Sequence, residues 1–410
     1  MNRRAVAASL LSWTLAVTLL RAIRLPNDFA QAHWLLGYRY GLLKRGLVGQ
    51  IVWDAGRPVG LRPGETAITV LSGVIFAAFL AALFVVSLRV ISRSRWSAPS
   101  IMIATAFLSS PFIVMSGHFF GYFDSLVIVL AIVSTALVLR GHVWSAAVLQ
   151  TVAVLVHESS VAVGLPVVLF AWLLRRPQPD DTRRVPWWPL LMPPLALAVL
   201  VANERFWLSP HVEGWLAAHL SHFPFVQGDM HQLVPSWLLT GSVENLGQLR
   251  HLGTRLSSGH MHGLVLPTTL AIASYLVEAA RPLRTRTAVA LFVVCGAPLA
   301  MHAVAWDTAR IWTMVIAVSY LALWVSVETA PPGGAVPVSV SLIAMVALTT
   351  SVIVVSPLMD GLNERLPLGV RLLLYAPVFV GCGFLIRQPA APSPESHRRD
   401  DGGTSPLIRK

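Results

Sequence analysis

Four acidic positions in this sequence lie beside long apolar runs, where a carboxylate could transfer protons. Asp28 follows the first apolar run, and Asp124 ends the segment Gly-His-Phe-Phe-Gly-Tyr-Phe-Asp. The pair His157-Glu158 separates two further runs, and Asp307 precedes another. Ionisable groups at a membrane are costly, so they usually mark sites of function. We predict that Asp28, Glu158 and Asp124 are catalytic residues, with Asp28 as the general base.

Basic residues near these carboxylates could hold an anionic substrate. Lys44 and Arg45 lie in the segment after the first apolar run, and Arg310 lies one helical turn after Asp307. Such cations stabilise a phosphate group when it departs as a leaving group. We therefore predict that these three cations bind the substrate together with His157 and Asp307.

Each of these acidic residues also has a purely structural explanation. Asp28, Asp124 and Asp307 could each cap the helix that follows it. His157-Glu158 could be a satisfied polar pair at a helix break. For any one residue the structural explanation is the simpler one. All of these residues, however, are predicted to lie on the external side at a similar depth in the membrane, which favours a functional site.

The composition indicates what must position these residues. Hydrophobic residues make up 55% of the 410 residues and charged residues only 12%, with a mean hydropathy of +0.67. Soluble domains carry roughly 25% charged residues, so this chain could not cover its surface in water. The net charge of +12 lies in short clusters between apolar runs. This is the pattern of membrane topology, and it argues against nucleic-acid binding.

Twelve apolar segments are candidates for transmembrane helices, because a bilayer core about 30 Å thick needs roughly 20 apolar residues. We predict an all-α bundle in a single integral membrane domain, residues 1–386, and a disordered cytoplasmic tail, residues 387–410. Arginine clusters between the segments place both termini in the cytoplasm. The predicted spans are 5–23, 66–88, 99–116, 122–140, 143–156, 160–174, 187–203, 264–280, 287–304, 311–327, 336–355 and 369–386.

The segments 143–156 and 160–174 are short and could instead form one long helix. Arg140 precedes them and several arginines between residues 175 and 184 follow, so both ends should be cytoplasmic. Two short helices that meet at an external break near His157-Glu158 satisfy this condition, whereas one continuous helix does not.

Two external segments, 24–65 and 204–263, complete the predicted architecture. In the first, five residues recur at helical spacing: Leu36, Tyr40, Leu43, Leu47 and Ile51. This spacing predicts an amphipathic helix in the membrane interface. The basic residues of this segment are on the disfavoured side, which predicts a bound anion, with snorkelling to lipid headgroups as the alternative. The second segment contains prolines and tryptophans, which predict short helices lying on the membrane.

These features resemble the GT-C superfamily of polytopic membrane glycosyltransferases. The resembling features are a first span, the segment Asn27-Asp28-Phe29, an amphipathic external helix and a series of spans with external polar residues. The resemblance implies a polyprenyl-phosphate-linked sugar donor and a catalytic acid in the first external loop, which Asp28 matches. Many members have a second acidic residue where Asn27 stands, so the need for a divalent metal is open.

The resemblance also implies partners and a location. The expected partners are a lipid-linked sugar donor, a glycan or lipid acceptor and membrane lipids, with no nucleic acid. The expected location is the bacterial inner membrane, where a multi-pass protein would serve cell-surface glycan synthesis. Many members also have a soluble external C-terminal domain, which we do not expect in this chain.

Other functions compete with this one. A transporter or flippase for a lipid-linked or anionic solute also needs buried charges, but it places them at the membrane midplane, often in two matching halves. An O-antigen polymerase-like enzyme has many spans and external arginines too. A scaffold would leave the polar set unexplained. The sequence has no P-loop, glycine-rich dinucleotide fingerprint or cysteine-rich metal motif, and Cys295 and Cys382 are expected to be free thiols.

Overall fold

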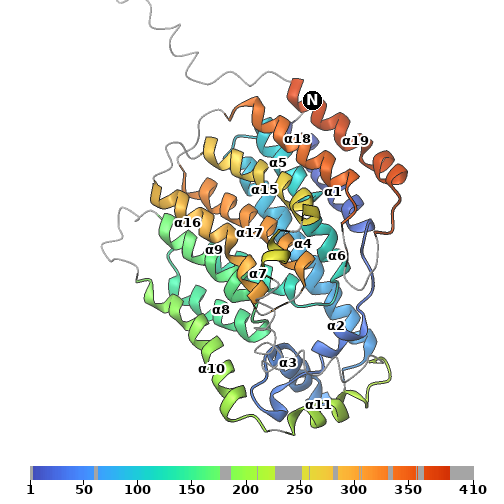
Figure 1. Ribbon diagram of the computed structural model, residues 1–410, viewed down its shortest axis with the longest axis vertical. Helices are drawn as coiled ribbons and strands as arrows, with labels where there is room; N and C mark the ends of the chain where they lie inside the picture. Colours follow the sequence, from blue (N-terminus) through green and yellow to red (C-terminus); the bar gives the residue numbers. More distant parts are fainter. Residues whose placement is uncertain are drawn as a thin grey trace, which may run out of the picture.

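Every element that the computed structural model describes is a helix, which confirms the all-α prediction (Figure 1). Cys295 and Cys382 are both free, as expected. The structure describes residues 3–59, 63–175, 186–209, 211–226, 252–257, 259–279, 285–303, 305, 307–330, 336–356, 358 and 364–387.

Six of the described helical segments are long and apolar enough to cross a membrane. They are Arg3–Leu20 (α1), Glu65–Arg93 (α4), Ala98–His118 (α5 and α6), Thr285–Ala303 (α16 and η6), Thr308–Thr329 (α17) and Leu368–Arg387 (α19). Four shorter apolar helices are Asp124–Leu139 (α7), Val143–Val156 (α8), Ser160–Leu174 (α9) and Val338–Ile353 (α18). The chain is therefore a membrane protein with several candidate spans.

The two remaining predicted spans, the seventh and eighth along the chain, correspond to helices that are shorter or less apolar than a span requires. Residues 187–203 overlap η3 (Trp188–Leu191) and α10 (Met192–Phe206), and residues 264–280 overlap α15 (Gly259–Ala279). Neither α10 nor α15 is among the helices with the length and apolarity of a span. A count of twelve spans thus remains a prediction.

The core of the bundle is formed by α5, α6 and α17. In their most apolar windows, 94% of residues in α5–α6 and 89% in α17 are buried, against 28% in α19 and 17% in α16–η6. Phe107 of α5 stacks on Tyr320 of α17 with ring centroids 3.7 Å apart. The outer helices present large apolar side chains such as Phe292 and Leu373 to the surroundings. Lipid would solvate such a surface, whereas water would not.

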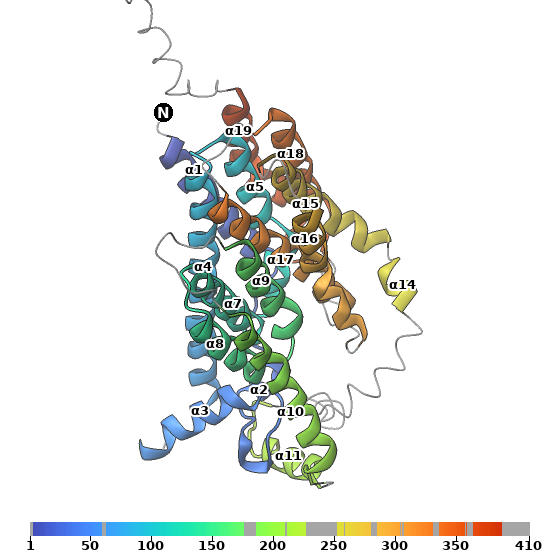
Figure 2. The ribbon, with the colours of Figure 1, turned by 90° about the vertical axis from the view of Figure 1, so that its left-hand side faces the viewer.

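The two ends of the bundle differ in what they contain. The start of α1 and the end of α19 lie at one end, and α3 and α11 lie at the other (Figures 1 and 2). Helix α4 has 29 residues and runs along most of the molecule, with Glu65 in its first turn and Arg93 in its last (Figure 2). Arg93 pairs with Glu328 of α17 at 2.8 Å. This ion pair joins the last turn of α4 to the end of α17.

Short helices cover the opposite end. They are α2 (Asp28–His33), η1 (Tyr38–Tyr40), α3 (Gly46–Gly56), η2 (Arg57–Val59) and α11 (Val212–Leu220). Trp34 anchors them, because it is buried and its indole N–H donates to the carbonyl of Gly121 at 3.0 Å. Gly121 has φ +94, a conformation that a side chain would strain.

The predicted continuous amphipathic helix through residues 36–51 is wrong. Gly41 (φ 120) and Arg45 (φ 62) have left-handed backbone conformations, which a right-handed helix cannot contain. Leu36 and Leu43 are buried in the core, whereas Ile51 is exposed. The spacing of the apolar residues matched a helix, but the glycine and the left-handed arginine divide the segment into η1 and α3.

The predicted external loop 204–263 is shorter than expected. Helix α10 continues to Phe206, and α15 already begins at Gly259. The short helices expected between them are confirmed for α11 and for α14 (Leu252–Leu256). Trp207 and Trp215 are exposed. Residues 227–251 and the tail 388–410 lie outside the described residues, whereas Arg387 still belongs to α19.

Candidate functional site

The predicted break between two short helices is confirmed. Helix α8 ends at Val156 and α9 begins at Ser160. His157 terminates α8 because its backbone is extended, with φ −162 and ψ 126. The backbone N–H of Ser159 donates to His157 Nδ1 at 3.1 Å and so fixes the ring.

Arg45 and Glu158 form a bidentate ion pair across 113 residues of sequence. Arg45 Nε donates to Glu158 Oε2 at 2.9 Å, and Arg45 Nη2 donates to Oε1. Burial opposes ionisation of Glu158, but the adjacent Arg45 holds its pKa well below the usual value. Arg45 Nη1 also lies 3.1 Å from His33 Nε2. The histidine must accept this bond, because an arginine can only donate.

Arg310 and Asp124 form a second mostly buried ion pair. Arg310 Nη2 donates to Asp124 Oδ1 at 2.6 Å and lies 3.3 Å from His157 Nε2. Asp307 caps α17 by accepting the backbone N–H of Arg310 at 3.3 Å, which confirms its structural role as a cap. Asp124 is the first residue of α7 and makes no such cap, so the capping explanation is wrong there.

Two atoms of this second pair retain bonding capacity. Arg310 Nε and Asp124 Oδ2 are buried and have no hydrogen-bond partner among the described residues. Buried polar groups are normally satisfied, so such atoms indicate a position for a polar ligand or water. Asp124 also lines a cavity of about 10 Å³, next to Phe119 and Thr313.

We call Arg45, Asp124, His157, Glu158 and Arg310 the central site. Four helices begin at it: α3 after Arg45, α7 at Asp124, α9 shortly after Glu158 and α17 shortly before Arg310. The start of a helix presents unpaired N–H groups and a partial positive charge. Four converging helix starts therefore favour a bound anion.

His157 adds a further donor to this site. Burial, aided by Arg45, lowers the pKa of His157 to about 3, so the ring is neutral at neutral pH. Because Nδ1 accepts from Ser159, the neutral ring carries its proton on Nε2, the atom that faces Arg310. Two N–H donors, Arg310 Nη2 and His157 Nε2, thus lie 3.3 Å apart. A ligand oxygen that accepts from both would satisfy both donors.

Lys44 lies beside the central site as a buried cation. Its side chain is 3% exposed. Burial lowers the pKa of Lys44 to about 8, although the negative charge of Glu158 works in the opposite direction. The lysine can therefore change its charge near neutral pH, unlike the two arginines.

Asp28 lies on α2 and is not one of the five residues that define the central site, although it was predicted with them. It occupies the first turn of α2, and the N-cap is Asn27, whose side chain accepts the N–H of Ala30 at 2.9 Å. The capping explanation for Asp28 is therefore wrong. His33 ends the same helix and contacts Arg45. At about 100° per residue, Asp28 lies about 140° around α2 from His33, so one short helix carries both Asp28 and a residue that contacts the central site.

The carboxylates of the central site do not fit a divalent metal. Nowhere in the described part of the chain do three His, Cys, Asp or Glu residues gather as metal ligands would. Glu158 and Asp124 are each bound to an arginine instead. A metal would have to displace both guanidinium groups.

Sequence reasoning missed two features. The contact of His33 with Arg45 was not foreseen, although a histidine five residues after Asp28 was a visible signal. It also missed a second buried cluster, formed by Arg21, Glu364 and Arg371, which we call the α19 cluster. Arg21 donates twice to Glu364 at 2.8 Å, and Arg371 donates once at 3.3 Å. An arginine inside the predicted span 369–386 was the signal for it.

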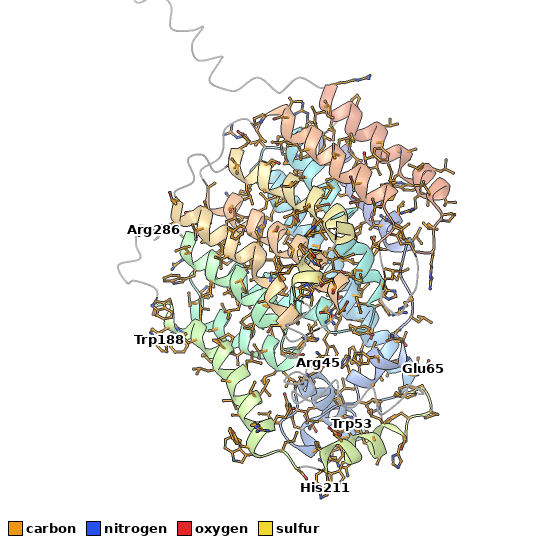
Figure 3. All side chains as sticks on the ribbon, viewed as in Figure 1. Arg45, Trp53, Glu65, Trp188, His211 and Arg286 are labelled. Carbon is orange, nitrogen blue, oxygen red and sulfur yellow. The ribbon has the colours of Figure 1, made fainter. Side chains whose placement is uncertain are left out.

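Figure 3 shows Arg45 and Trp53 at the end of the molecule that holds α3, away from Arg286. Comparison with models of known protein families, with curated proteins and with solved structures finds no match. The geometry defines a class of site: a buried ionic site at the starts of four helices in a membrane protein.

Proposed function

We propose that this protein is a glycosyltransferase that moves a sugar from a polyprenyl-phosphate donor to a glycan or lipid acceptor. We also propose that the chain crosses a bacterial inner membrane twelve times and that the central site lies on the external side. The observation that carries it is the convergence of four helix starts and two arginines on one buried site. A phosphate group is an anion that suits such a site.

The reaction needs few protein groups. The acceptor hydroxyl oxygen attacks the anomeric carbon, the bond from that carbon to the phosphate oxygen breaks, and polyprenyl phosphate leaves as an anion. Arg45, Arg310 and Lys44 stabilise this phosphate, so no general acid is required. The hydroxyl proton passes to a carboxylate. Glu158 is a weak base because Arg45 holds its pKa low, and we assign the base to Asp28.

A transporter or flippase for a lipid-linked or anionic solute is the second candidate. One observation favours it: α8 and α9 are two short helices whose break carries the buried His157 and the partly buried Glu158. Broken helices of this kind form the substrate sites of many transporters. Such a protein would move the donor across the membrane without cleaving it.

A reconstitution experiment separates the two candidates. Proteoliposomes with the full chain would receive a labelled polyprenyl-phosphate sugar and membrane-derived acceptor. We expect wild-type protein to release polyprenyl phosphate, Arg310→Ala to release almost none, and Arg93→Ala to match wild type. Movement of intact donor between leaflets without release would replace the glycosyltransferase with the transporter. Absence of both activities would refute the two proposals together.

A further inference from the structure

A groove of about 610 Å³ lies next to α3, outside the central site. One wall is a single face of α3, because Gln50, Trp53, Asp54 and Arg57 are spaced at three, four and seven residues. The other walls come from η1 and α11. The groove is thus built by three short helices at the end of the bundle that also holds the central site (Figures 1 and 3).

Three aromatic rings form a fixed row in this groove. The ring of His219 lies 5.7 Å from Trp53 and 5.8 Å from Tyr40. The indole N–H of Trp53 points to the carbonyl of Leu35 at 3.4 Å, and His219 Nε2 lies 3.1 Å from the same oxygen. A carbonyl only accepts, so His219 carries its proton on Nε2. Two of the three rings are therefore oriented by one backbone oxygen.

Oriented polar groups lie beside these rings. Gln50 Oε1 accepts the N–H of Tyr38 at 2.8 Å, and Gln50 Nε2 donates to Asp54 Oδ2 at 2.9 Å. A carboxylate can accept about four bonds, so Asp54 keeps capacity for a ligand. Arg39 lies with its guanidinium carbon 5.6 Å from the Tyr40 ring. The groove thus offers aromatic faces together with an amide, a carboxylate and guanidinium groups.

We propose that this groove binds a saccharide, as the part of the acceptor glycan that precedes the reacting hydroxyl. The inference rests on the proposed function and names its acceptor class. A sugar ring has a C–H face that packs on an aromatic ring and hydroxyl groups that bond to amides and carboxylates. A lipid chain would cover Asp54 without offering a hydrogen bond to its remaining acceptor capacity, at a cost. A polyphosphate would pair with Arg39 and Arg57 but would also meet the negative charge of Asp54, whereas a neutral saccharide can bond to all three groups.

The position of the groove fits this assignment. Arg45 precedes α3, and a helix rises 1.5 Å per residue, so Gln50 and Arg57 lie about 8 and about 18 Å along α3 from Arg45. A saccharide bound along this face therefore extends from the vicinity of the central site toward the end of the molecule. Ligand pockets of roughly 300–1,000 Å³ are typical for small molecules, and this groove lies within that range.

The test is saturation-transfer NMR on the full chain in lipid nanodiscs, because maltoside detergents would themselves occupy a saccharide site. The probes are neutral trisaccharides of glucose, galactose, mannose and N-acetylglucosamine in both anomeric linkages. We expect transfer to at least one probe. Trp53→Ala and Asp54→Asn should each weaken its binding by roughly tenfold or more. Trp207→Ala, which removes an exposed indole outside the groove, should leave binding unchanged.

Two results would overturn the saccharide site: no saturation transfer to any probe, or equal binding by wild type, Trp53→Ala and Asp54→Asn. Asp54 is exposed, so its variant tests the site even where the loss of Trp53 disturbs folding. The proposed function is tested separately by release of polyprenyl phosphate. Saccharide binding without release in wild type would refute only the glycosyltransferase, and release without saccharide binding would refute only the groove.

Discussion

The central site and the α19 cluster contain the same kinds of residue but lie at helix ends of opposite polarity. In the α19 cluster, Arg21 and Arg371 share Glu364, which leaves one excess positive charge. Both arginines also donate to backbone carbonyls at the end of α18, at distances of 3.2 to 3.5 Å. The end of a helix carries partial negative charge, so it compensates the excess cation. This cluster therefore holds three elements together.

The central site has the reverse arrangement. With Lys44, its three cations are matched by three carboxylates, those of Asp124, Glu158 and Asp307. The four helix starts then add positive potential that no side chain offsets. The difference shows how two buried arginine–carboxylate clusters can be distinguished. Both clusters leave buried arginine nitrogens without a hydrogen-bond partner among the described residues: Arg21 Nη1 and Arg371 Nε in one, and Arg310 Nε in the other. The polarity of the helix ends is therefore what separates them, because only the cluster at helix N-termini lies where an added negative charge is favoured.

The largest expected effect is that of Asp28→Asn on transfer. Loss of a general base typically costs about 10²–10⁴ in rate, and the substitution keeps the size of the side chain. The matched control is Asn27→Ala, which removes the actual N-cap and should cost about 1 kcal/mol of stability without changing transfer per folded molecule. Release of polyprenyl phosphate by purified protein at matched amounts measures both. Near-normal release by Asp28→Asn would move the base to Glu158 or Asp124.

Arginine substitutions test the comparison directly. Arg310→Ala removes the guanidinium group that faces His157 Nε2 and should lower transfer by about 10²–10³, as loss of one oxyanion donor does. Arg310→Lys should also be impaired, because lysine keeps the charge but not the planar fork. Arg371→Ala should reduce the yield of folded protein yet leave transfer per folded molecule close to wild type. If both alanine variants lose transfer equally, the functional distinction between the clusters is wrong.

Stability measurements test the structural role of the α19 cluster. Glu364→Gln leaves two buried arginines facing a neutral amide, and breaking a buried pair typically costs about 3–5 kcal/mol. Glu328→Gln is the control, because its partner Arg93 is half exposed and such a pair contributes about 0–1 kcal/mol. Thermal denaturation in nanodiscs should show a clear drop for the first variant and little change for the second. A drop of equal size in both would remove the structural role of the α19 cluster.

Features set by local composition were predictable from the sequence. The helical class follows from apolar run lengths, and the break at His157-Glu158 follows from arginines on both sides of the segment. Prediction from local composition nevertheless failed for one segment, and the reason is physical. The spacing in residues 36–51 suggested one helix, because periodicity reports which residues are apolar and not whether Gly41 and Arg45 adopt helical backbone angles.

Features set by long-range pairing were not predictable in the same way. Arg45 and Glu158 are 113 residues apart, and Arg21 and Glu364 are 343 apart. Side assignment placed Arg45, Glu158 and Arg310 in one compartment but could not choose their partners. That choice depends on which helices pack together, and the sequence alone does not encode it in any local pattern. The polarity of the helix ends around each cluster became visible only with the fold.

The smallest expected effect concerns Lys44, a cation beside the central site whose charge changes near neutral pH. Burial lowers its pKa to about 8, so it is mostly protonated below that pH and mostly neutral above it. Only the protonated form attracts phosphate, and donor affinity should therefore fall as the pH rises through about 8. Between about pH 7 and pH 9 the charged fraction falls about tenfold, which limits the loss of affinity to about tenfold.

The other titratable groups of the central site do not produce this pH dependence. His157 titrates near pH 3 and Glu158 is already ionised, so neither changes charge there. The donor is a phosphodiester, which does not titrate near neutral pH either. Lys44→Arg keeps the positive charge throughout and should flatten the dependence, while Lys44→Gln should bind weakly at every pH. Donor binding to nanodisc-embedded protein across this range measures all three. A fall of the same size in Lys44→Arg would assign the dependence to another group and remove Lys44 from the anion site.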